Sequence, residues 1–323
     1  MNNDMKKFLR KALFIPAVML CLFVFGVLFV GNQYIEGYNA SFIDKVARLK
    51  SINEPKIILA GHSNLAFGMN SKMLQDAMNM PVVNLGLHGG LGNAFNENIA
   101  RFNINSGDLI IVCHSNFADD DIIGNTGLAW ITIEYHWDLY KILRVKDYLE
   151  MILEYPRYWI GSFKLWINSE GNKSSDDSSY SRKAFNEFGD IVFKPKNKQK
   201  TLDELFKSDT QKVPLINDTC INRLNEYNKY IKSKGATLLI AGYPIIEVDF
   251  MPSAEEYDKF QRELESRLDC EVISNYRDYF IPYKYFYDSI FHLDEEGVKI
   301  RTQQLINDIQ RWQTKQQNKT GNL

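Results

Sequence analysis

Four short apolar runs, separated by segments of helical periodicity, constrain the fold of this chain most. The runs lie at residues 56–60, 81–85, 108–113 and 236–241, and each is followed by a glycine or by polar residues. Runs of this length next to turn-forming residues predict buried strands. Amphipathic helices are predicted at 71–78, 94–102, 218–234, 253–268 and 294–312, with a further short strand at 271–273. Strands that alternate with helices predict an α/β fold, with a parallel sheet covered on both faces.

The N-terminus carries a basic flank followed by an uncharged apolar segment. Residues 1–11 contain Lys6, Lys7, Arg10 and Lys11, and residues 12–31 lack charge. About 20 helical residues cross a hydrocarbon core of about 30 Å, so this segment is long enough to span. Because no small-x-small cleavage site follows, we expect an uncleaved transmembrane anchor rather than a removed signal peptide. Positive residues favour the cytoplasmic side, which predicts a cytoplasmic N-terminus and an extracytoplasmic (periplasmic or cell-surface) body.

The remaining chain is divided by a break in the alternating pattern. We expect a linker helix at 32–54 and one catalytic domain at 55–323, with a helical insertion at about 119–214. Aromatic residues between Trp130 and Trp166 in that insertion are suited to core packing, to stacking on sugars, or to a membrane interface. Apolar residues make up 45% of the chain, enough for a large core, and the net charge of -2 argues against nucleic-acid binding.

The four cysteines predict neither a metal knuckle nor a redox motif. Cys21 falls in the anchor and Cys113 in a predicted strand, which leaves Cys220 and Cys270 as the two that could pair. No Cys-x-x-Cys spacing occurs. Unpaired buried thiols are the favoured interpretation, and a pairing of Cys220 with Cys270 stays open.

Polar residues follow three of the predicted strands. The first strand runs into Gly61, His62 and Ser63, the second into Gly86 and His88, and the third into His114, Ser115 and Asn116. In doubly wound sheets, ligands bind beyond the carboxyl ends of the strands, so these residues are expected at one edge. A serine at a strand-to-helix turn can expose its hydroxyl, with backbone N–H groups beside it to face a developing oxyanion.

A serine nucleophile needs a base, and the far end of the chain offers one. Asp288 and His292 lie just before the predicted final helix, which Asp294 can cap. An imidazole can take the hydroxyl proton, while a carboxylate fixes its tautomer and stabilises the imidazolium. We therefore expect Ser63, His292 and Asp288 to meet as a catalytic triad.

At the level of motifs, the sequence resembles the SGNH or GDSL hydrolases, from residue 56 to residue 312 apart from the insertion. The family blocks are Gly-x-Ser, a glycine, an asparagine and Asp-x-x-His-Leu, and the matching residues are Gly61 to Ser63, Gly86, Asn116, Asp288 and His292 with Leu293. The resemblance implies a three-layer α/β/α fold with a flavodoxin-like sheet. It also implies that Gly86 and Asn116 form the oxyanion hole.

Three features depart from the family pattern. His62 stands where the family has aspartate, Asn116 lacks the Gly-x-Asn-Asp frame of the family, and three residues rather than two separate Asp288 from His292. The single anchor and the long insertion are similar to membrane-tethered SGNH proteins of teichoic acid D-alanylation and of alginate or peptidoglycan acetylation. That similarity implies acyl transfer to a surface glycan or teichoic-type polymer through an acyl-serine, beside a polytopic membrane-bound O-acyltransferase, with no cofactor.

Other interpretations of the same residues remain open. Ser115 is the rival nucleophile. His62, His88 and His114 are expected to shape an acceptor pocket, although they could instead hold a metal with Asp119, Asp120 and Asp121. The glycine-rich segment 89–92 lacks the spacing of a nucleotide loop and is interpreted as a turn. Plain ester hydrolysis and a non-catalytic scaffold are the alternative functions.

Overall fold

The centre of the molecule is a five-stranded parallel sheet. The computed structural model describes residues 3–30, 33–118, 123–134, 143–171, 178–207 and 210–320. In sheet order, the strands are β2 (Val82–Asn84), β1 (Ile57–Gly61), β3 (Leu109–Cys113), β4 (Thr237–Ile240) and β6 (Glu271–Val272). Each neighbouring pair is parallel. The expected α/β fold with a parallel sheet is confirmed, and this order is that of doubly wound, flavodoxin-like sheets.

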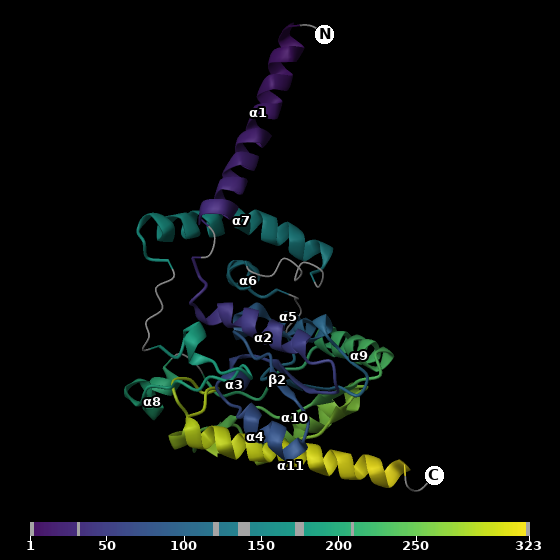
Figure 1. Ribbon diagram of the computed structural model, residues 1–323. Helices are drawn as coiled ribbons and strands as arrows, with labels where there is room; N and C mark the ends of the chain where they lie inside the picture. Colours follow the sequence, from purple (N-terminus) through teal and green to yellow (C-terminus); the bar gives the residue numbers. More distant parts are fainter. Residues whose placement is uncertain are drawn as a thin grey trace.

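Helices cover both faces of the sheet, as Figure 1 shows. One face packs against α2 (Ser41–Ser51), α5 (Asn93–Asn98), α9 (Asp218–Ser233) and α10 (Ala254–Arg267). The other packs against α4 (Ser71–Met78) and α11 (Glu295–Thr320). The molecule therefore has three layers, with an apolar core on each face of the sheet.

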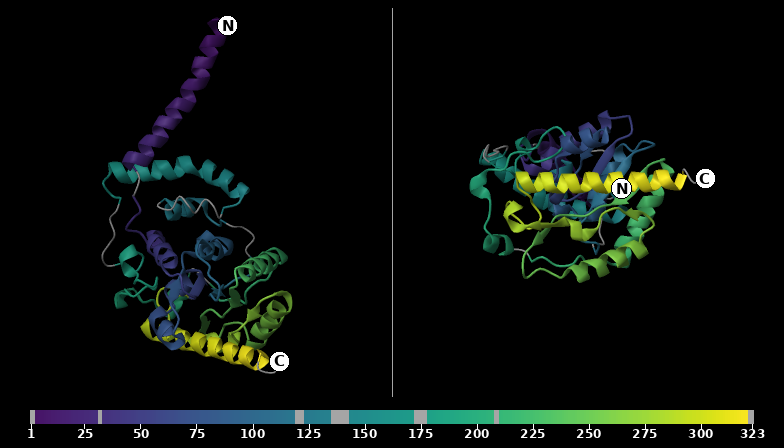
Figure 2. Two further views of the ribbon diagram at one scale, coloured as in Figure 1. Left: turned by 45° about the vertical axis from the view of Figure 1, so that its right-hand side comes forward. Right: turned by 90° about the horizontal axis from the view of Figure 1, so that it is seen from below.

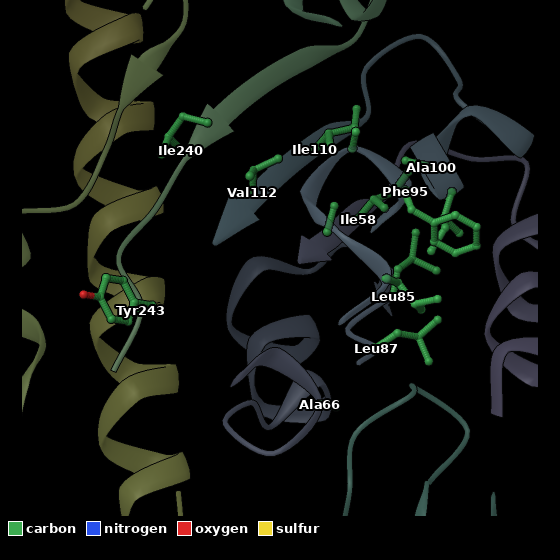
Figure 3. Close-up of a cluster of buried hydrophobic side chains, with 14 of the residues drawn as sticks. Ile58, Ala66, Leu85, Leu87, Phe95, Ala100, Ile110, Val112, Ile240 and Tyr243 are labelled. Carbon is green, nitrogen blue, oxygen red and sulfur yellow. The ribbon is translucent and has the colours of Figure 1, made fainter. Parts of the chain in front are cut away.

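The strands read as continuous apolar runs because both of their faces are buried. Successive side chains of a strand point to opposite faces. Ile58 accordingly joins one core with Ile110 and Ile240, as drawn in Figure 3, whereas Ile57 and Leu59 belong to the other core.

Most predicted boundaries lie close to the observed ones. The helix predicted at 71–78 matches α4, and Gly235, with φ of 74°, follows the end of α9 as a C-terminal cap. The helix predicted at 94–102 divides into α5 and a 3-10 turn at Ile99–Phe102. A second parallel pair, β5 (Ile245–Glu247) with β7 (Phe280–Pro282), was not predicted.

The described part of the insertion contains three helices and then returns to the edge of the sheet. Its helices are α6 (Thr126–Ile133), α7 (Val145–Ile167) and the short α8 (Leu202–Phe206). Between α7 and α8, the carbonyl of Phe188 accepts the Asn84 N–H of β2 at 2.9 Å. Buried Asp190 accepts hydrogen bonds from Ser71 Oγ at 2.6 Å and from Asn84 Nδ2 at 2.8 Å. These bonds hold residues 178–193 beside the carboxyl end of β2.

The N-terminal helix stands apart from the body (Figures 1 and 2). Helix α1 (Asn3–Phe25) is long and apolar enough to cross a membrane, and its described apolar side chains are exposed rather than buried in the body. It begins within the basic flank and continues as a π-helical turn at Gly26–Val30. Residue 31, the end of the predicted anchor, lies outside the described residues. Within the predicted linker helix at 32–54, α2 covers only Ser41–Ser51.

Candidate active site

Ser63 lies at the turn between β1 and the short helix α3 (Ser63–Ala66). The turn requires a residue without a side chain, because a Cβ at Gly61 would lie 3.2 Å from the Cys113 carbonyl oxygen and 3.0 Å from a Leu65 methyl. The strand order changes direction at this point, because β2 and β3 lie on opposite sides of β1. Ser63 therefore sits at the switch point where doubly wound sheets bind ligands.

The structure brings Ser63 together with His292 and Asp288. His292 Nε2 lies 2.9 Å from Ser63 Oγ, across 229 positions of sequence. His292 Nδ1 lies 2.7 Å from Asp288 Oδ1. The His292 and Asp288 side chains are only 8% and 12% exposed, so their interaction is poorly screened by water. The three side chains form a continuous hydrogen-bonded relay from carboxylate to hydroxyl.

The loop before α11 accommodates the extra residue between Asp288 and His292. The His292 N–H donates to the Ser289 carbonyl at 3.2 Å, and the Tyr287 N–H donates to the His292 carbonyl at 2.8 Å. Asp294 then caps α11, accepting the Gly297 N–H at 2.8 Å. This tight loop turns both the carboxylate and the imidazole toward the sheet edge.

The hydrogen bonds determine which ring nitrogen of His292 carries the proton. Burial raises the pKa of Asp288, but hydrogen bonds from His292 and Tyr180 outweigh it and hold that pKa below its ordinary value. Asp288 is thus ionised near neutral pH and can only accept hydrogen bonds. His292 Nδ1 must therefore donate, which leaves the Nε2 lone pair to accept the Ser63 hydroxyl proton. This is the tautomer that a general base requires.

Two further aromatic residues hold the relay, and neither was predicted. The Tyr180 hydroxyl, from the insertion, donates to Asp288 Oδ2 at 2.7 Å and lies 3.4 Å from His292 Nδ1. Burial, reinforced by the Asp288 charge, raises the pKa of Tyr180, so it stays a donor. The Phe67 ring stacks on the His292 ring with centroids 3.9 Å apart and planes 9° apart. No periodic pattern in the sequence could have identified either residue, because Tyr180 stands alone in a polar tract and Phe67 simply follows α3.

The oxyanion role of Gly86 and Asn116 stays a prediction. The Gly86 N–H donates to Asn84 Oδ1 at 2.9 Å, and a Cβ at Gly86 would lie 2.7 Å from the Ala66 nitrogen. Close packing against α3 is thus one reason for glycine at this position. The Asn116 residue is exposed, and its carbonyl accepts a hydrogen bond from Asn93 Nδ2 at 2.9 Å.

The three strand-end histidines have different environments. Gly61 and Cys113 are register partners in β1 and β3, so the following residues, His62 and His114, lie side by side with ring centroids 5.2 Å apart. Burial, together with the proximity of His114, lowers the pKa of His62 to about 3. His88 is exposed, and its Nδ1 accepts the Gly90 N–H at 2.9 Å within the turn that was predicted at 89–92.

A buried ion pair lies behind these histidines. His114 is fully buried, with Nε2 2.7 Å from Glu97 Oε1. Arg223 Nε lies 3.3 Å from the other oxygen of Glu97. Burial raises the pKa of Glu97, but hydrogen bonds from His114 and Arg223 outweigh this and lower it to about 2. His114 is therefore bound within the protein rather than open to a pocket.

The alternative interpretations find less support in this geometry. His292 contacts Ser63 and not Ser115, although both serines occur in a His-Ser-Asn string. Within the described ranges, no three His, Cys, Asp or Glu side chains are grouped so that they could hold a metal ion. Asp119, Asp120 and Asp121 lie outside those ranges. Cys220 and Cys270 form no disulfide with each other, and Cys21 and Cys113 likewise form none.

A cavity of about 410 Å³ opens beside the acid of the relay. It is lined by Ser178, Ser179, Tyr180, Lys198, Lys200, Tyr287 and Asp288. Its walls thus combine aromatic rings, hydroxyls and two exposed lysines.

A scan against protein-family models found no match, and neither did searches of the curated proteins and of the solved structures.

Proposed function

We propose that this chain is a membrane-anchored serine acyltransferase of the SGNH type, which modifies a cell-surface glycan or teichoic-type polymer through an acyl-serine. One observation carries the proposal, namely the relay of hydrogen bonds from Asp288 through His292 to Ser63. Its members come from the end of β1 and from the loop before α11, in the order of the SGNH motifs. The resemblance rests on those motifs and on this geometry.

The relay supports a two-step acyl transfer. Ser63 Oγ attacks the carbonyl carbon of a donor ester while His292 Nε2 takes the hydroxyl proton, and Asp288 stabilises the imidazolium. The tetrahedral intermediate expels the donor alcohol, which leaves with that proton from His292. His292 next deprotonates an acceptor hydroxyl, which attacks the acyl-serine. Collapse forms the new ester and returns the proton to Ser63 through His292.

The acceptor is proposed to be a polymer because of what surrounds the relay. The cavity beside Asp288 contains tyrosines suited to sugar rings and two lysines suited to an anionic chain. An anchored body outside the cytoplasm would work at the membrane surface, where a polytopic O-acyltransferase would supply the acyl group. With water as acceptor, the same residues would carry out ester hydrolysis.

A fluorophosphonate probe tests the nucleophile without a known substrate. We expect the full-length protein in nanodiscs to be labelled at Ser63, as located by peptide mass spectrometry. Ser63→Ala should abolish labelling. The matched control is Ser115→Ala, because Ser115 lies in the same tripeptide at the end of the neighbouring strand.

Two results would count against the proposal. Labelling of the Ser63→Ala protein at the parent rate would place the nucleophile elsewhere, and a parent protein that resists the probe would favour a non-catalytic scaffold. If Ser63 is labelled, an activated acyl ester with and without a glycan acceptor separates the two reactions. Acylated glycan indicates transfer, whereas free acid alone indicates hydrolysis.

A further inference from the structure

Helix α7 lies across the end of the N-terminal helix. Figures 1 and 2 show it roughly perpendicular to α1, between that helix and the body. Phe23 of α1 contacts Tyr155 with ring centroids 5.5 Å apart, and Phe25 meets Trp166 edge-on at 6.1 Å. Gly26 approaches Trp159 so closely that no side chain would fit between them. The end of the apolar helix is thus packed against α7 through aromatic rings.

One side of α7 is attached to the body. Met151 is buried, and its carbonyl accepts the Trp130 indole N–H of α6 at 2.7 Å. The Trp130 ring also packs on Tyr155 and Tyr158, with centroids 5.0 and 5.5 Å apart. The opposite side of α7 therefore faces away from the body, toward the side from which α1 extends.

That opposite side is apolar and exposed along the whole helix. Its large aliphatic residues recur at helical spacing and are Val145 (88% exposed), Leu149 (62%), Ile152 (65%), Leu153 (71%), Ile160 (50%) and Ile167 (58%). The exposed charged residues Glu150, Arg157 and Lys164 are seven positions apart and so form a separate line at the margin of this face. An apolar face of this extent, bordered by charge along one margin, marks an interaction surface.

We propose that α7 lies in the plane of the membrane surface, with its apolar face inserted at the boundary between headgroups and acyl chains. The occupant of that face is lipid, because the face continues the exposed apolar surface of α1 on the same side of the body. Interfacial helices combine a polar face with an apolar face rich in Leu and aromatic residues, and tryptophan and tyrosine concentrate at this depth. The inference concerns the orientation of the body on the membrane and does not depend on the proposed acyl transfer.

Spin labels in the full chain test this placement. Single cysteines are introduced as Leu153→Cys and, beyond Pro156, as Ile160→Cys, in a background with Cys21→Ser and Cys270→Ser, since Cys113 and Cys220 are buried. The control is Gln303→Cys, at an exposed position on α11 at the far end of the body from α1. The protein is placed in nanodiscs of phosphatidylcholine and phosphatidylglycerol, and each nitroxide label is measured for its collision rate with two relaxants. One relaxant is oxygen, which concentrates in hydrocarbon, and the other is a nickel chelate, which stays in water.

We expect labels at 153 and 160 to lie about 5–10 Å below the headgroup surface, so that they lose most collisions with the chelate and gain collisions with oxygen. The label at 303 should show the reverse. If labels on α7 collide with the chelate as often as the label at 303, the face is in water and the proposal fails. If they are shielded from both relaxants, a protein covers the face and the proposal also fails. A circular dichroism melt like that of the parent establishes that each variant is folded.

Discussion

Replacing Asp288 by asparagine removes one charge from the relay and leaves its shape almost unchanged. Tyr180 donates to Asp288 Oδ2, so in Asp288→Asn the amide oxygen can keep that hydrogen bond. The amide NH2 then faces His292 Nδ1, 2.7 Å away in the parent, and donates to it. The ring proton moves to Nε2, which points at Ser63 and can no longer accept its proton.

The loss of rate follows from the buried charge pair. In the transition state, an imidazolium forms beside the carboxylate, with charge centres about 4 Å apart, which corresponds to about 4 kcal/mol at an effective dielectric constant of about 20. That value suits this pair because both side chains are largely buried. Each 1.36 kcal/mol is tenfold in rate, so the charge alone accounts for about a 10³-fold loss. The unfavourable tautomer increases the loss further.

The assay is the pseudo-first-order rate of fluorophosphonate labelling of Ser63 in the full-length protein. The matched control is Asp294→Asn, the same substitution in the same loop. It should label at the parent rate, because asparagine is as good an N-cap as aspartate. Labelling of Asp288→Asn as fast as the parent, with both variants folded, would refute the assignment of Asp288 as the group that stabilises His292.

The remaining predictions concern stability. Lys56→Met should lower the free energy of unfolding in urea by about 3–5 kcal/mol, because it removes the cation that lies 2.9 Å from the fully buried Asp108 and leaves that carboxylate with backbone N–H donors alone. Lys72→Met, which breaks an exposed ion pair with Asp76, should cost less than about 1 kcal/mol, and equal losses would contradict the role of burial. The pKa of Glu97 is about 2 in the folded protein, whereas its ordinary value is 4.5. The ionised carboxylate therefore stabilises the folded state above about pH 5, and this contribution is lost as the pH falls toward about 2. Glu97→Gln should therefore flatten the dependence of the urea midpoint on pH in that range. If the slope is unchanged, the interactions of Glu97 with His114 and Arg223 are not the source of this pH dependence.

Local patterns in the sequence were sufficient for the layered α/β fold. The strands at 56–60 and 108–113 are short apolar runs whose two faces are both buried, and such runs are recognisable without knowing their partners. Gly235 and Asp294 also identify helix ends, because caps depend on the neighbouring backbone alone. The pair β5 and β7 was missed, since each strand has only three residues and is recognisable only by its partner.

The sequence by itself determined which residues could do chemistry, because Ser63, His292 and Asp288 occur in short recognisable motifs. Only the tertiary structure decided that Ser63, rather than Ser115, meets the imidazole, since that contact depends on strand order and on how the loop before α11 folds. The contact of Tyr180 with Asp288 was likewise evident only in the tertiary structure. Its position comes from the packing of the insertion on the edge of β2, and packing between distant segments leaves no periodic signal in the chain.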